Sequence, residues 1–167
     1  MKRKNFHLSH SVLGTALLLL LEGALLVFLG RSPIYAQARW MLIIVMAFFG
    51  GVANIVVATE VIEEVRNAKH MLVLLSAVVS IFVVYFTFQY GYLISILPDS
   101  FQGLTSNPVD LLLHSTMIFV FNPLYLPTTE AARALLLINT FTALGLVLFI
   151  LQNIWQIRAG EKRSIIQ

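Results

Sequence analysis

The stretch that decides the fold runs from Pro108 to Glu130 and reads PVDLLLHSTMIFVFNPLYLPTTE. Its apolar run, residues 109–121, holds about 13 residues and would reach about 20 Å as a helix. That length is too short to cross a hydrocarbon core of about 30 Å. Proline is favoured at a first helical position and an acidic residue stabilises a first turn, so Pro108 and Asp110 indicate a helix start. The sequence therefore predicts a short helix that enters the membrane without crossing it.

The end of this short helix is predicted at the dipeptide Asn122-Pro123. A residue before proline avoids the helical region, so the helix cannot continue through it. We expect residues 121–127 to return to the outer surface in extended form. Non-helical backbone is tolerated at membrane depth only where it is buried in protein or lines a water-filled cavity. The whole segment is therefore predicted to be a re-entrant pore loop.

The composition of the chain agrees with a membrane location. Of its 167 residues 59% are hydrophobic and 11% are charged, whereas soluble domains contain about 25% charged residues. This excludes a soluble globular domain, a disordered chain and a coiled coil. The absence of cysteine excludes disulfides and thiolate metal sites. The 11 Lys and Arg residues are too dispersed for nucleic-acid binding, and the lipid bilayer is the expected partner.

Four other stretches are long and apolar enough to span a membrane. They cover residues 11–29, 40–59, 71–97 and about 131–157. We therefore predict an all-α membrane protein with four transmembrane helices, plus a re-entrant pore helix and loop between the third and the fourth. The predicted parts are an N-terminal two-helix membrane segment (1–69), a channel-like pore module (70–160) and a short cytoplasmic tail (161–167).

The orientation follows from the basic residues near the ends of these spans. Eight lie on the side of the two termini, and three lie on the other side. The eight are Lys2, Arg3, Lys4, Arg66, Lys69, Arg158, Lys162 and Arg163, and the three are Arg31, Arg39 and Arg133. Because basic residues stay inside, both termini are predicted to be cytoplasmic, in the plasma (inner) membrane.

Residues 71–157 resemble the pore module of the two-helix, potassium-channel-like superfamily. The likeness is carried by Asp110, Ser115 and Thr116 on the short helix, followed by PTTEAAR at 127–133. This last motif looks like the P-x-T-x-x-G/A-R start of the family's inner helix, and Gly145 stands near the family's hinge glycine. The resemblance implies an ion-channel-like homo-oligomer, with four copies around one axis, that passes monovalent cations and needs no other cofactor.

The filter is where the chain departs from this family. A TVGYG-type filter points its carbonyls inward, which requires glycines with positive φ. Residues 119–125 contain no glycine, and Pro123 fixes its own φ near −65°. A strictly potassium-selective filter is therefore not expected, which leaves a wider pore lined by side chains or a hydrophobic plug. The predicted pore and filter residues are Thr116, Phe119, Val120, Phe121, Asn122, Pro123, Leu124 and Tyr125.

Polar residues at membrane depth form a second candidate site. Glu22, Gln89 and Asn139 share a predicted depth of about 10–13 Å below the outer boundary. One interpretation is a polar belt that links the first helix to the pore module, and the other is helix packing through hydrogen bonds. His114, on the short helix, is interpreted either as a group that tunes the filter or senses pH, or as a histidine used in packing.

Two functions remain open from the sequence. The first is an ion-channel-like pore, in which Gly145 is the candidate gating hinge. The second is a non-conducting structural or regulatory protein that keeps the channel fold. An enzyme is not expected, since H-E-x-x-H, G-x-S-x-G and paired acids do not occur, and the sequence predicts no metal site. Arg133, at the outer end of the fourth predicted span, is the one Arg or Lys within these spans, so a voltage sensor is not expected either.

Overall fold

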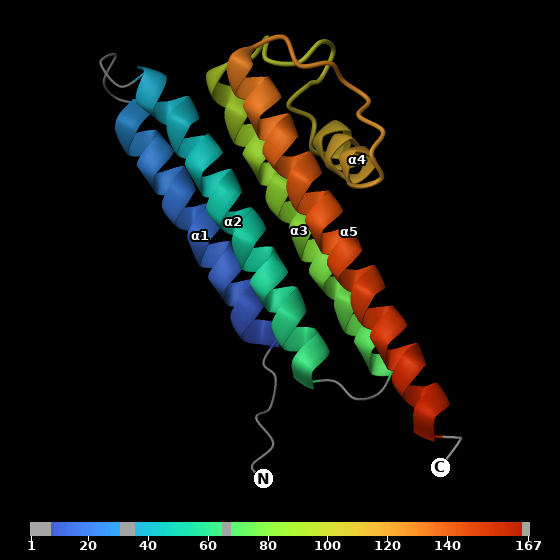
Figure 1. Ribbon diagram of the computed structural model, residues 1–167. Helices are drawn as coiled ribbons and strands as arrows, with labels where there is room; N and C mark the ends of the chain where they lie inside the picture. Colours follow the sequence, from blue (N-terminus) through green and yellow to red (C-terminus); the bar gives the residue numbers. More distant parts are fainter. Residues whose placement is uncertain (1–7, 31–35, 65–67, 165–167) are drawn as a thin grey trace.

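The computed structural model describes residues 8–30, 36–64 and 68–164, and in these residues the chain is built of helices (Figure 1). They are α1 (Leu8–Gly30), α2 (Ala36–Glu64), α3 (Ala68–Ile96), α4 (Pro108–Phe119) and α5 (Glu130–Ser164). The four long helices run alternately up and down, and the short α4 lies beside the ends of α3 and α5 at which these two helices are joined. The all-α prediction is confirmed for the described residues.

Three helices contain stretches long and apolar enough to cross a membrane, which makes the chain an integral membrane protein. The stretches are Ala38–Thr59 on α2, Val73–Ile96 on α3 and Glu130–Gln152 on α5. Their 22, 24 and 23 residues reach about 33–36 Å, which exceeds a hydrocarbon core of about 30 Å. Three of the four predicted spans are therefore confirmed.

The remaining predicted span, residues 11–29, lies on α1. The apolar stretch among the described residues of α1 is Leu17–Leu29, which would reach only about 20 Å. A crossing by α1 stays a prediction. At the other end of the chain α5 continues to Ser164, so it includes part of the predicted tail 161–167. Residues 165–167 of that tail lie outside the described residues.

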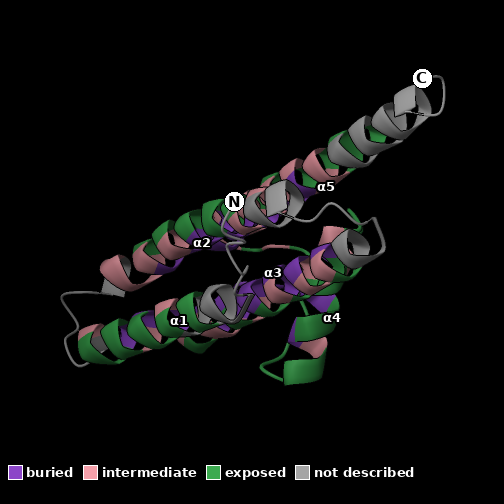
Figure 2. Cartoon of the chain, turned by 90° about the horizontal axis from the view of Figure 1, so that it is seen from below, coloured by how far each residue is buried: buried purple, intermediate pink, exposed green. Residues whose placement is uncertain are grey.

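Helix α3 is the central element of the fold because it contacts each of the other four helices. Buried residues follow it along much of its length (Figure 2). Four of its aromatic side chains, Phe82, Tyr85, Phe86 and Tyr90, are fully buried. Ring centroids are 4.8 Å apart for Phe82 and Phe86 and 5.6 Å apart for Tyr85 and Phe86. Such pairs add about 0.5–1.5 kcal/mol each to burial, so these rings form the centre of the core.

Two adjacent glycines bring α2 close to its neighbours. A Cβ on Gly50 would overlap the Tyr85 ring of α3, and a Cβ on Gly51 would lie 2.7 Å from Oγ1 of Thr142 on α5. The Tyr85 hydroxyl donates to the Met46 carbonyl at 2.6 Å, one turn before Gly50. This hydrogen bond holds α2 against α3. On the other side of α2, the missing side chain of Gly51 leaves room for Thr142 of α5.

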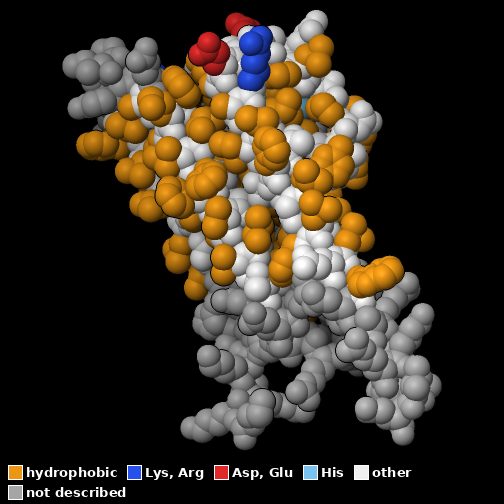
Figure 3. Space-filling model, viewed as in Figure 1, with side chains coloured by type: hydrophobic (Ala, Val, Ile, Leu, Met, Phe, Trp, Pro, Cys, Tyr) orange, Lys and Arg blue, Asp and Glu red, His pale blue; other side chains and the backbone are white. Residues whose placement is uncertain are grey.

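The outer surface of the helices is apolar over most of their length. Figure 3 shows hydrophobic side chains across the visible face, and the acidic and basic side chains that it colours lie at the end where α5 begins. Large side chains such as Leu20, Phe28 and Phe141 are more than half exposed. A soluble protein rarely exposes so large an apolar surface, so the lipid bilayer is the partner of this surface.

Candidate functional site

The candidate site is the segment 97–129, which joins α3 to α5 and contains α4. Its two ends pair with each other in antiparallel fashion through Phe101 and Pro127. The amide of Gln102 donates to the Leu126 carbonyl at 2.9 Å, and the amide of Thr128 donates to the Ser100 carbonyl at 2.9 Å. Sequence reasoning missed this pairing, which closes the segment into one unit that carries α4.

Helix α4 begins where the sequence predicted. Asn107 is the N-cap residue, and its side chain accepts a hydrogen bond from the Val109 amide at 3.0 Å. Pro108 follows at the first helical position, where a missing N–H costs nothing. The hydroxyl of Thr105 donates to the Asp110 carboxylate at 2.6 Å, which holds this acidic residue in the first turn. These contacts fix the start of α4 at Asn107 and Pro108.

The end of α4 is a Schellman motif. The Asn122 amide donates to the Met117 carbonyl and the Phe121 amide donates to the Ile118 carbonyl, both at 2.8 Å. Phe121 has φ +60°, the one positive φ at a non-glycine residue in the described ranges. A side chain in this conformation costs about 1–2 kcal/mol. We call residues 120–127, which follow α4, the return. Its residue with left-handed backbone is therefore Phe121, directly after the C-cap residue Val120.

The course of the return corrects one prediction. The sequence predicts that residues 121–127 return in extended form, but the chain turns at 120–121 and bends at 124–125 before the β-bridge at Pro127. The extended prediction is wrong because the capping hydrogen bonds and the left-handed Phe121 redirect the backbone directly after α4.

The inner face of α4 packs against α3. Leu111, His114, Ser115 and Ile118 are its buried residues. The Ser115 hydroxyl donates to the Val83 carbonyl of α3 at 2.9 Å. The opposite face leaves Val109, Leu112 and Leu113 exposed. Helix α4 is therefore covered by its own chain on one side only.

The His114 side chain contacts three aromatic rings. Its centroid is 4.7 Å from that of Tyr90, 5.1 Å from Phe101 and 5.4 Å from Tyr125. The imidazole is fully buried, and neither nitrogen has a hydrogen-bond partner among the described residues. Burial lowers the pKa of His114 to about 4. The ring is therefore neutral near pH 7, which favours a packing role for His114.

The predicted pore and filter residues divide into two groups. Thr116 and residues 120–124 are exposed on the uncovered side of α4 and of the return. Phe119 and Tyr125 turn inward, with the Phe119 ring 5.6 Å from that of Phe82 and the Tyr125 ring on His114. The structure therefore leaves six of the eight predicted residues exposed.

The predicted polar belt consists of two separate contacts. Nε2 of Gln89 donates to Oε2 of Glu22 at 2.6 Å, and Nδ2 of Asn139 donates to the Tyr90 hydroxyl at 3.1 Å. Glu22, Gln89 and Asn139 are all fully buried. One contact joins α1 to α3, and the other joins α5 to α3. Tyr90 also touches His114, a link that sequence reasoning missed.

The candidate hinge, Gly145, lies within the continuous helix α5. A Cβ there would meet Cδ1 of Ile55 at 3.6 Å, which is an ordinary contact distance. A glycine in a helix interior costs about 0.5–1 kcal/mol relative to alanine, so this position is locally weak. Its use as a hinge stays a prediction.

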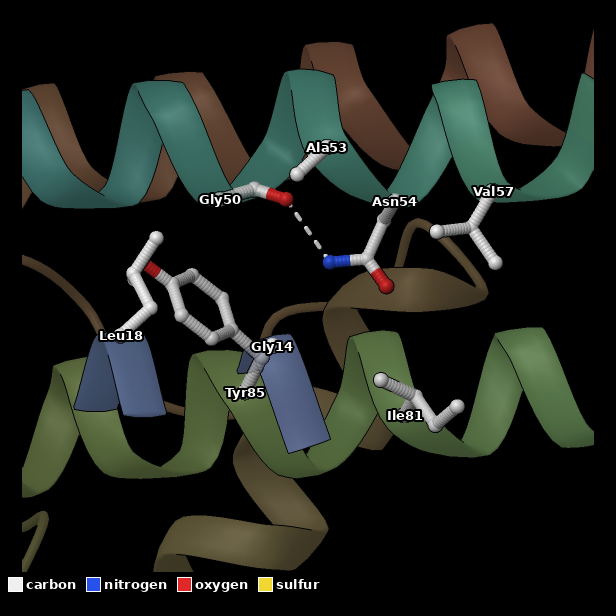
Figure 4. A pocket seen from close by; sticks show the side chains of 8 residues that line it. All are labelled: Gly14, Leu18, Gly50, Ala53, Asn54, Val57, Ile81 and Tyr85. Atoms are coloured by element: carbon white, nitrogen blue, oxygen red, sulfur yellow. Dashed lines mark hydrogen bonds between the residues drawn. The ribbon is translucent and has the colours of Figure 1, made fainter. Parts of the chain in front are cut away.

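A cavity of about 160 Å³ lies between α1, α2 and α3 (Figure 4). It is lined by Gly14, Leu18, Gly50, Ala53, Asn54, Val57, Ile81 and Tyr85. The Asn54 side-chain nitrogen donates to the Gly50 carbonyl at 2.8 Å, within α2. The walls are mainly apolar, and a Cβ on Gly14 would touch nothing within 4 Å.

The fold and the site together define an integral membrane protein of helices with one short apolar helix inserted between two long ones. Comparison of the chain with protein families, with curated proteins and with solved structures finds no match.

Proposed function

We propose that the chain is a subunit of an ion-channel-like membrane protein, in which residues 108–127 surround a central axis in a homo-oligomer. The order of elements supports this proposal, because a short helix with an irregular return lies between two long apolar helices. One such segment cannot enclose a pore, so several copies are needed. The resemblance to potassium-channel-like pores implies four.

The observation that carries the proposal is the exposed irregular backbone after α4. Residues 120–124 are non-helical and exposed. At membrane depth such backbone must be covered by protein or face water, because lipid offers no hydrogen-bond partners. The chain itself covers only the inner face of α4. Neighbouring copies around a water-filled axis would meet both requirements.

The side chains on this surface indicate how ions would be handled. Thr116 and Asn122 are its polar members, whereas Val120, Phe121 and Leu124 are apolar. The glycine-free return favours a path lined by side chains over a ring of carbonyl cages. A pore of this kind would pass monovalent cations with little discrimination between potassium and sodium.

The proposed topology has four spans, with α1 as the first and both termini in the cytoplasm. The membrane is the plasma (inner) membrane, and the segment 98–130 faces outward. Because the natural chain has no cysteine, single-cysteine variants report orientation directly. Ser106→Cys should react with an impermeant maleimide in intact cells, and Ser164→Cys should react only after permeabilisation. The reverse pattern would contradict this topology.

Flux through liposomes tests conduction. Purified protein should pass potassium and sodium, and Asn122→Leu should lower this flux several-fold because it removes the amide from the proposed path. Gln102→Leu is the matched control, since it removes an exposed amide from the stem of the segment, the paired residues 100–102 and 126–128. Equal flux in Asn122→Leu and in the unchanged protein would refute a path lined by residues 116–124.

A second function, a non-conducting protein that keeps the channel fold, is favoured by one specific observation. Phe121 and Leu124 are 48% and 45% exposed on the proposed axis side, where they would form a hydrophobic plug. In that case the oligomer forms without flux, and Phe121→Ser or Leu124→Ser opens it. Flux in the unchanged protein would exclude this alternative.

A further inference from the structure

Outside the pore segment, the carboxyl group of Glu22 and the amide of Gln89 form a buried pair. Nε2 of Gln89 donates to Oε2 of Glu22 at 2.6 Å, and both side chains have no exposed surface. Each group then keeps one oxygen, Oε1, that has no partner among the described residues. Both oxygens are acceptors when the acid is ionised, so they cannot bond to each other.

An ionised Glu22 does not fit these surroundings. Burying a charge without a counter-ion costs several kcal/mol, and leaving buried acceptors unpaired adds to that cost. A protonated carboxyl, by contrast, is a donor as well as an acceptor. It can form two reciprocal hydrogen bonds with a primary amide, N–H to one acid oxygen and acid O–H to the amide oxygen. One added proton then supplies the donor that both unpaired oxygens lack.

We propose that Glu22 is a membrane-buried proton-binding site, with the proton on Oε1 and donated to Oε1 of Gln89. The ligand is the proton itself, and the site lies on α1, apart from the pore segment. Its occupancy docks α1 on α3, because only the neutral acid completes both hydrogen bonds of the pair. Loss of the proton leaves a charge and two unpartnered acceptors at this contact, and α1 loosens from α3.

The other groups around Glu22 leave it without a cationic partner. From α3, the hydroxyls of Tyr85 and Tyr92 lie near it, and they donate to the carbonyls of Met46 and Leu19 at 2.6 and 3.0 Å. On α2 the basic residue is Arg39, close to the start of the helix, and the acidic residues Glu60, Glu63 and Glu64 lie at its other end. In the described part of the chain Glu22 makes no ion pair.

Dicyclohexylcarbodiimide, a hydrophobic carbodiimide, tests this inference on the full chain in membranes. A protonated carboxyl adds across one C=N bond, with its oxygen bonding to carbon and its proton moving to nitrogen. The acyl group then migrates to nitrogen and leaves a stable acylurea, so no other reactant is needed. Mass spectrometry should place one adduct on Glu22, and the yield should fall as the pH is raised. Glu22→Gln should abolish this adduct, whereas Glu130→Gln, an exposed acid on α5, should leave it unchanged.

An infrared measurement keeps the test independent of reagent access. The difference spectrum between the unchanged protein and Glu22→Gln should show the carbonyl band of a protonated carboxyl at neutral pH. Absence of that band overturns the proposal. Loss of labelling on adding sodium at constant pH also overturns it, because the pair would then bind a metal cation. Neither result depends on conduction, so the test is separate from that of the proposed pore.

Discussion

Replacing Gly50 by alanine tests the close approach of α2 and α3, the helix against which α4 packs. The new Cβ would overlap the Tyr85 ring, which borders the same cavity as Gly50 (Figure 4). The ring has little freedom to move, because it is fully buried and its hydroxyl is bonded to the Met46 carbonyl at 2.6 Å. The helices must therefore separate or the hydrogen bond must break.

The expected magnitude combines three effects. Overpacking a core costs about 1–3 kcal/mol, and losing the hydrogen bond of Tyr85 costs about 1 kcal/mol. Alanine regains about 0.5–1 kcal/mol over glycine in a helix. The net expectation for Gly50→Ala is a loss of about 1–3.5 kcal/mol in the free energy of unfolding.

Gly14→Ala is the matched control. Gly14 borders the same cavity from α1, but a Cβ there meets nothing within 4 Å. The same substitution should therefore stabilise the protein by about 0.5–1 kcal/mol through helix propensity alone. Because an added Cβ overlaps Tyr85 at Gly50 and meets nothing at Gly14, the sign of the effect should reverse between them.

Thermal unfolding in a mild detergent, followed by loss of the monodisperse peak in size-exclusion chromatography, measures both variants. Gly50→Ala should lower Tm and Gly14→Ala should raise it. The penalty of Gly50→Ala should also shrink in a Tyr85→Leu background, because the two changes are coupled through one contact. Equal Tm values for the two alanine variants would refute the reasoning.

Three further predictions concern α4, all read out by thermal or denaturant unfolding. Phe121→Gly should be more stable than Phe121→Ala by about 1 kcal/mol because φ is +60° there; the opposite order would contradict the left-handed cap. Ser115→Ala should cost about 1 kcal/mol through the lost bond to Val83, whereas Thr116→Val, whose hydroxyl bonds within α4, should cost less. Because the pKa of His114 is lowered from 6.5 to about 4, the unfolded state binds more protons between these values. Stability should therefore fall as the pH drops through this range, and His114→Phe should remove that dependence.

The layout of the chain follows from the sequence alone. Span lengths, Pro108 and Asp110 at the start of α4 and Asn122-Pro123 after its end are local signals. They predicted the short helix and four spans, three of which the structure confirms. The depth argument likewise anticipated that Glu22, Gln89 and Asn139 become buried, because polar groups avoid lipid wherever protein can cover them. Such signals depend on residues close together in the chain, so they can be interpreted without knowing the fold.

Which side chains contact each other, by contrast, is decided only by the tertiary structure. Gln89 bonds to Glu22 whereas its neighbour Tyr90 bonds to Asn139, because successive residues of α3 face different helices. Tyr125 turns onto His114 and away from the exposed side of the return, since the stem between 100–102 and 126–128 sets its direction. These contacts join residues far apart in the chain, and helix rotation and loop path select them. The spacing of apolar residues says little about which side chains contact each other in this protein, because apolar side chains are equally suited to lipid and to the protein core.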